Sequence, residues 1–297
     1  MRRKLVKQGN NAMTVTVPHL WVKRCNLKPG SEVAIEEKGR GLYIDIIDIT
    51  GDKKEIAIPS IDKFMRRLIH AWYTQGYDEL KVSYHDVETI NLIRGITPEL
   101  LGFEIVEQGS NYCIIKNIGK ESEAEFDPTL RKIFLMILSI GAELLAKLKL
   151  RDFKYLSQIA NQDTMVNKLA FYCERLLTKY GYPADFKKSN FMFTFVWTLE
   201  QIADEFRDIC REAAASKRNF SKAELMQLHE VNELVALLHT TFYKQSLDNL
   251  IALNNRTKEL YQLFLKELEK GSTERLLMHH LIKISDKINS LTHFMVS

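Results

Sequence analysis

The chain has 297 residues, of which 45% are hydrophobic and 27% charged, as is ordinary for a folded globular protein of two or three domains. No apolar run reaches the roughly 18 residues that span a bilayer, and the first eleven residues are charged without an apolar stretch after them, so we expect a cytoplasmic protein without membrane insertion. Four scattered cysteines form no CxxC pair, which offers neither a zinc cage nor a disulfide framework and favours reduced thiols.

Positive charge is concentrated at the N-terminus. The net charge is +4, yet residues 1–40 carry nine basic and three acidic side chains, so the rest of the chain is net negative. The candidate DNA-binding residues in this segment are Arg2, Arg3, Lys4, Lys7, Lys23 and Arg24. Because each lysine or arginine that neutralises a phosphate releases a counterion, this cluster favours salt-dependent binding to DNA. The alternative is a solvated basic surface.

Residues 1–50 are predicted to form a small β-rich unit. The expected elements are a turn at 9–11, a period-two strand at 13–17, a short helix at 19–24, a turn at 28–30 and a hairpin of strands 33–35 and 42–46 joined by 38–41. So few residues bury little surface alone. We therefore expect a second copy to complete the core.

Residues 51–120 are predicted to form a small α/β connector. Phe64, Leu68 and Trp72 recur every fourth residue within a helix expected at 61–75, which Gly76 ends. The further elements expected are a strand at 80–84, a short helix at 86–93, and strands at 103–105 and 112–115 that turn at 108–111. This segment shows no chemical constellation.

From residue 121 onward the pattern is helical. Helices are expected at 127–149, 152–180, 189–215, 221–243, 246–270 and 272–297. Short loops favour a bundle, and the matching helix order of about 125–216 and 219–297 predicts two consecutive three-helix units. The predicted fold class is α+β and multidomain, with a β-rich head (1–50), an α/β connector (51–120) and a mainly α body (121–297).

Four short motifs near the N-terminus occur in the order of a known family. They are RKLVKQGN at 3–10, TVTVP at 14–18, WV at 21–22 and LKPGSEV at 27–33. This segment resembles the AbrB/MazE-like (SpoVT) DNA-binding family over about 45 residues. The resemblance implies a swapped-hairpin homodimer that lays basic residues against double-stranded DNA. Heads of this kind also occur in antitoxins, but the large body argues against that role.

A second motif lies in the helical region. The segment LEQIADEFRDI at 199–209 resembles the Leu-Glu-Arg-Ile-Gly-Asp-His element of the PhoU family of phosphate-uptake regulators, and the two three-helix units extend this resemblance over roughly 170 residues. The resemblance implies a phosphate-linked regulator, metal binding through the acidic element, and a phosphate transporter or sensor protein as a partner. The combination of such a head with such a body resembles an archaeal arrangement.

The candidate metal ligands are acidic. Glu200, Asp204 and Asp208 are four residues apart and so share one helix face. Asp163 on the preceding helix would add a further ligand, since Asp163 and Asn167 have the same spacing. A divalent or trivalent ion would offset the repulsion between these carboxylates. Iron, zinc, magnesium and manganese are all candidates, and the sequence fixes no cofactor.

Two features oppose a metal site. Arg207, Arg211 and Lys168 offer simple ion pairs with these acids on a solvated surface. The second helical unit also departs from the pattern, with Ile282 and Ser290 in place of acidic residues. We therefore expect at most one site, in the first unit.

The expected function is regulatory and not enzymatic. The nucleophile elbow GxSxG, the phosphate-binding P-loop and the dinucleotide fingerprint are absent from the sequence. We expect a DNA-binding transcriptional regulator linked to phosphate uptake, whose head binds DNA as a homodimer while the body senses or docks. The alternative is a metal-binding helical adaptor of a phosphate transporter or signalling partner, with the head used for dimerisation only.

Overall fold

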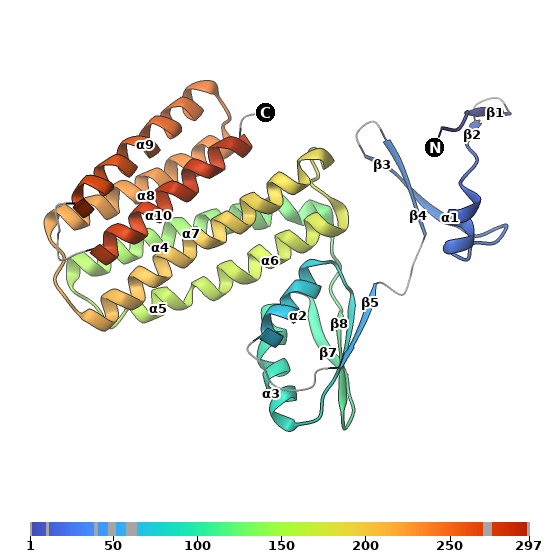
Figure 1. Ribbon diagram of the computed structural model, residues 1–297, viewed down its shortest axis with the longest axis horizontal. Coiled ribbons are helices and arrows are strands. Elements are labelled where there is room, and N and C mark those ends of the chain that lie inside the picture. The colour runs from blue at the N-terminus through green and yellow to red at the C-terminus, as the bar shows by residue number, and fades with distance from the viewer. Residues whose placement is uncertain are drawn as a thin grey trace. The chain divides into compact units, whose positions relative to one another are not determined.

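The computed structural model describes residues 2–9, 12–38, 41–46, 52–57, 64–269 and 275–295 (Figure 1). The chain divides into two compact units, residues 1–51 and 52–297. Small sheets and a mainly helical body give it an α+β fold, as expected. Four sequence expectations fall wholly or partly outside the described residues: the turns at 9–11 and 38–41, the start of the helix at 61, and the helix break at 271–272.

The first unit contains two antiparallel hairpins and a short helix. These elements are β1 (Val6–Gln8) paired with β2 (Ala12–Thr14), α1 (His19–Arg24), and β3 (Val33–Lys38) paired with β4 (Gly41–Ile46). The prediction of a strand over 13–17 was wrong at its C-terminal end, because β2 ends at Thr14. Thr14 pairs with Val6, the first residue of β1. Residues 15–17 therefore have no described strand beside them. Alternation of apolar and polar residues does not make a strand without a neighbouring strand to share hydrogen bonds.

The first unit has no enclosed core among its described residues. Of the side chains in this unit whose exposure the structure describes, none is buried, and the most exposed large apolar residue is Leu20, at 79%. The other exposed large apolar side chains of this unit are Leu5, Val6, Met13, Val15, Ile35, Leu42 and Tyr43. The apolar alternation seen in the sequence therefore faces outward in the single chain.

The second unit begins with a four-stranded sheet of order β5-β6-β8-β7. Its strands are β5 (Lys53–Ala57), β6 (Glu79–Ser83), β7 (Phe103–Gln108) and β8 (Tyr112–Asn117), with β5 parallel to β6 and the other pairs antiparallel. Strand β5 was not predicted, because this edge strand begins with three charged residues and carries little apolar alternation.

Helices α2 (Phe64–Thr74) and α3 (Val87–Ile96) belong to this part of the chain. Both pack their apolar residues into the core together with Leu80, Val82, Cys113 and Ile115 of the sheet. Helix α3 begins where the Asp86 side chain accepts a hydrogen bond from the Thr89 N–H. The predicted strand–helix–strand pattern is confirmed.

The body consists of long helices with short connections. They are α4 (Phe126–Leu150), α5 (Leu156–Asn161), α6 (Asp163–Tyr180), α7 (Ser189–Ser216), α8 (Lys222–Tyr243), α9 (Leu247–Glu269) and α10 (Arg275–Met295). The prediction of one helix over 152–180 was wrong, since α5 and α6 are separate and meet at Gln162. The Asp163 side chain is tied to Arg207 of α7 and lies where a carboxylate favours a helix start.

The helices form two groups of three. Helices α4, α6 and α7 pack on one another, as do α8, α9 and α10, while α4 also contacts α8 and α7 contacts α10. The helix order expected from the sequence is observed, with α5 as an additional short helix. The division of the body into two repeated units stays a prediction. None of the described helices combines the length and the apolar character needed to span a bilayer.

A buried arginine joins the sheet-containing part to the body. Arg175 of α6 is fully buried and donates hydrogen bonds to the backbone carbonyls of Tyr73 (3.0 Å) and Tyr77 (2.7 Å). Its guanidinium also pairs with Asp78, and with Glu121 at 2.6 Å. These contacts fix α2 against α6.

Candidate functional site

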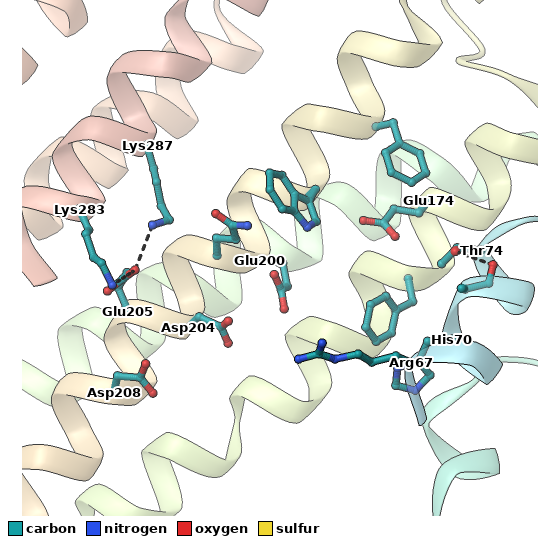
Figure 2. Close-up of a pocket in the computed structure, with 15 residues that line it drawn as sticks. Arg67, His70, Thr74, Glu174, Glu200, Asp204, Glu205, Asp208, Lys283 and Lys287 are labelled. Carbon is teal, nitrogen blue, oxygen red and sulfur yellow. Dashed lines mark hydrogen bonds and ion pairs between the residues drawn. The ribbon is translucent and has the colours of Figure 1, made fainter. Parts of the chain in front are cut away.

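An open cleft of about 890 Å³ lies between α2, α6, α7 and α10 (Figure 2). Helix α2 contributes Arg67 and His70, and α10 contributes Lys283 and Lys287. The carboxylates that line it come from α6 and α7 and are Glu174, Glu200, Asp204, Glu205 and Asp208. Three aromatic side chains complete the wall, namely Phe171, Phe193 and Trp197.

The structure places the predicted metal ligands in two groups. Glu200, Asp204 and Asp208 all line the cleft, which is the shared helix face that their spacing indicates. Asp163 is not a lining residue. It is 5% exposed at the start of α6 and accepts a hydrogen bond of 3.3 Å from Asn167.

Arg207 neutralises most of this acidic group. Its Nη1 lies 3.0 Å from Asp163 and also contacts Asp204, while its Nε lies 2.9 Å from Asp208. Arg211 approaches Asp208 only at 3.9 Å. The alternative to a metal site was that nearby basic residues form ion pairs with these acids. The structure shows such ion pairs for Arg207.

Lys168, by contrast, does not join this acidic group. Its Nζ donates to the carbonyl of Pro98 at 2.6 Å. Across the part of the chain that the structure describes, no group of three histidine, cysteine, aspartate or glutamate side chains is placed to hold a metal ion. A metal at Asp163, Glu200, Asp204 and Asp208 stays a prediction.

Two carboxylates of the cleft, Glu174 and Glu200, have no hydrogen-bond or ion-pair partner within the described residues. Glu174 is 6% exposed, and its burial, with the nearby Glu200, raises its pKa to about 8. Burial and repulsion from Asp204 and Asp163 raise the pKa of Glu200 to about 7. Figure 2 shows Glu174, Glu200 and Asp204 directed into the cleft, with Arg67 extending toward them from α2. At this end of the cleft, Glu174 and Glu200 are paired with no described cation, whereas Asp204 pairs with Arg207.

Glu205 at the other end is fully paired. Its carboxylate lies 2.7 Å from His280 Nδ1, 3.0 Å from Lys287 Nζ and 3.4 Å from Lys283 Nζ. Burial alone would raise the pKa of Glu205, but the hydrogen bonds from His280 and Lys287 outweigh it and lower the pKa to about 2. The two lysines of the cleft therefore belong to Glu205.

Several residues of the cleft were not predicted from the sequence. Arg67 and His70 belong to a segment read as a plain connector, because only the packing of α2 on α6 brings them to the cleft. Glu174 carried a signal, since it is a charged residue inside the apolar run FYCERLL at 171–177. A charge within an apolar helix seam is seldom buried without a functional or pairing reason.

The candidate DNA-binding residues all belong to the first unit. Arg2, Arg3 and Lys4 precede β1, Lys7 lies in β1, and Lys23 and Arg24 form the last turn of α1. All six side chains are exposed. No ion pair joins any of them to a carboxylate of the described residues, so their charge remains available to an anionic partner.

Comparisons with known proteins give a distant structural likeness. No known family matches the chain, and no curated protein matches it. The chain is similar to the crystal structure of the phosphate transport system regulatory protein PhoU from Streptococcus pneumoniae, with a TM-score of 0.46 and 15% sequence identity, over 59% of this chain and 93% of that chain. The resemblance of the N-terminal motifs to a DNA-binding family stays a prediction.

Proposed function

We propose that this chain is a non-catalytic, homodimeric DNA-binding regulator in the cytoplasm. The unit 1–51 binds double-stranded DNA, and the helical body senses a signal or docks a partner. One observation supports this most directly: the same small unit carries exposed apolar side chains and exposed, unpaired cations. The exposed apolar side chains suit contact with a second copy of the unit, and the exposed cations suit binding to a polyanion.

The apolar surface of the β3–β4 hairpin favours a second copy. Ile35 pairs with Ile44, and Val33 and Leu42 lie two residues from them along the same strands. Opposite residues of an antiparallel pair point to the same side, so these four side chains share one face. Ile35 is 62% and Leu42 66% exposed. Burying such side chains stabilises an interface by about 1.5–3 kcal/mol each.

The cations favour DNA as the anionic partner. In a homodimer the basic surface doubles and meets two segments of the phosphate backbone. Lysine and arginine contacts to phosphates release counterions and supply affinity without base specificity. Strongly salt-dependent binding to duplexes of mixed sequence is therefore expected.

The link to phosphate uptake is supported by the motif at 199–209, which resembles an element of phosphate-uptake regulators. On this proposal a phosphate transporter or a sensor protein is the partner of the helical body. Cys113, Cys173 and Cys210 are buried free thiols, which suits a reducing compartment.

Binding of the full chain to mixed duplex DNA at two salt concentrations tests the proposal. The test variant replaces Arg2, Arg3, Lys4 and Lys7 with alanine. The matched control replaces four exposed lysines of the body, Lys132, Lys149, Lys154 and Lys187, and so removes the same charge.

We expect the wild type and the control to bind at micromolar or lower concentration. The test variant should bind far more weakly, with a salt slope smaller by up to about 7, because the homodimer loses eight cations and each lost phosphate contact lowers the slope by about 0.9. Equal weakening of both variants would indicate nonspecific attraction to net charge and contradict the proposal.

A helical adaptor is the second candidate function. The acidic cleft, with its unpaired Glu174 and Glu200, gives the body a binding site of its own that needs no DNA. In this alternative the N-terminal unit only dimerises. A folded dimer that binds no DNA at low salt would favour the adaptor.

A further inference from the structure

Glu174 is the most unusual group in the cleft. Its side chain is more than nine-tenths buried, lines the cleft, and has no hydrogen bond or ion pair with any described residue. Without a cation nearby, burial disfavours the ionised form of Glu174 and raises its pKa to about 8. A bound cation would favour the ionised carboxylate. Such a group suits a ligand that supplies the missing positive charge.

The surrounding charges leave this need unmet. Arg207 pairs with Asp204 and Asp208, and Lys283 and Lys287 pair with Glu205. Arg67 is exposed at the cleft and is within ion-pair distance of no carboxylate that the structure describes. Glu174 on α6 and Glu200 on α7 therefore remain as two uncompensated acidic groups on adjacent helices.

The size and walls of the cleft indicate what kind of cation fits. A volume of about 890 Å³ lies within the range of small-molecule sites and far exceeds the space of a bare ion. Trp197, which is 51% exposed, lines the cleft together with Phe171 and Phe193. Aromatic faces attract organic cations and cover alkyl chains. The described residues place no set of three metal-ligating side chains here.

We propose that this cleft binds a small linear polyamine, with ammonium groups on Glu174 and Glu200 and the alkyl chain against the aromatic wall. Two carboxylates on neighbouring helices match a ligand with separated positive charges. Charge-assisted hydrogen bonds from ammonium to carboxylate are the strong kind. The inference concerns the helical body alone and is independent of whether the N-terminal unit binds DNA.

Isothermal titration of the full chain with spermidine, without DNA present, tests the proposal. The comparison ligands are octane-1,8-diol, an uncharged chain of similar length, and Mg²⁺. The test variant is Glu174→Gln with Glu200→Gln, which keeps side-chain size and removes both charges. The matched control is Glu233→Gln with Glu259→Gln, whose side chains are 65% and 66% exposed on α8 and α9.

We expect spermidine to bind the wild type and the control alike. The Glu174 and Glu200 variant should bind at least about tenfold more weakly, as expected for the loss of hydrogen bonds to charged groups. Trp197→Ala should weaken binding several-fold. The diol should not bind, because it supplies no charge.

Three results would overturn the inference: no binding of spermidine, equal loss of affinity in the test and control variants, or binding of Mg²⁺ in place of spermidine. Circular dichroism of each variant verifies that it is folded. A protein that binds spermidine and not DNA would retain this inference and refute the proposed function, and the reverse result would do the opposite.

Discussion

The two compact units of this chain are stabilised in different ways. The unit 52–297 has one continuous core that extends from Met65 in α2 to Met295 in α10. In the unit 1–51, no side chain whose exposure the structure describes is buried, and many of its large apolar side chains are exposed. We infer that the second unit is stable as a single chain, whereas the first needs a partner surface to bury its apolar residues.

Charged residues differ between the units in the same way. In the second unit Arg175 is fully buried and bonded to two carboxylates and two carbonyls. In the first unit the cations are exposed and unpaired among the described residues. The buried charge of the second unit therefore holds packed elements together, whereas the exposed charges of the first unit are available for binding. Two substitutions and a change of pH test this contrast.

The largest effect is expected from Arg175→Met. The substitution removes the buried donor of the Tyr73 and Tyr77 carbonyls and leaves Asp78 and Glu121 with only the partly exposed Lys179. Breaking a buried ion pair from one side costs about 3–5 kcal/mol. Urea unfolding followed by far-UV circular dichroism reports it, because the long helices all lie in the second unit. Arg211→Met is the control, since the Arg211 side chain is 61% exposed, and it should change stability by less than about 0.5 kcal/mol. Equal effects of the two would contradict the assigned role of Arg175.

A smaller effect is expected from Ile35→Asp in the first unit. If a second copy covers the apolar face of the β3–β4 hairpin, a carboxylate there weakens the dimer by about 2–3 kcal/mol. Sedimentation equilibrium measures the dissociation constant. Leu247→Asp introduces the same charge at a 73% exposed apolar position of the second unit and should leave the dimer intact. A dimer that tolerates Ile35→Asp would show that this face is not the interface.

The smallest effect is expected from pH, at the junction of α7 and α10. The pKa of Glu205 is lowered to about 2 in the folded state, so its stabilisation is present above its ordinary pKa of about 4.5 and is lost as pH falls toward 2. The unfolding free energy should therefore fall between pH 5 and pH 3. This fall should be about 1–2 kcal/mol larger in the wild type than in Glu205→Gln.

His280 has the opposite sign. Burial alone would lower its pKa, but hydrogen bonds with Glu205 and Glu212 raise it above the ordinary value. Its contribution is complete below pH 6.5 and is lost as pH rises through the raised pKa. Lys283 and Lys287 also face Glu205. A pH profile that is identical in wild type and Glu205→Gln would contradict this account of the junction.

Local patterns predicted most elements of the second unit. Amphipathic periodicity located α4, α7 and α8 to within about a residue or two, because helix faces are set by residues three and four apart. The edge strand β5 and the break between α5 and α6 were missed. Both depend on contacts with distant segments, namely the pairing of β5 with β6 and the tie from Asp163 to Arg207.

Sequence spacing predicted the ion-pair partners of the acidic side chains less well. The sequence offered Arg207, Arg211 and Lys168 equally as partners of the acids, and the structure gives that role chiefly to Arg207. Lys168 turns instead to a carbonyl 70 residues away in the chain. Spacing along a helix decides which side chains share a face, but it does not decide which of several neighbours across helices they meet.

The sequence by itself determined the basic N-terminal end, most of the helices, and the shared face of Glu200, Asp204 and Asp208, because composition and short-range periodicity are local properties. Only the tertiary structure decided that Glu174 and Glu200 remain unpaired in a cleft that α2 helps to line. Burial and ion pairing depend on which distant segments pack together. The same carboxylate is an ordinary solvated charge on an exposed helix and a group with a raised pKa inside a cleft.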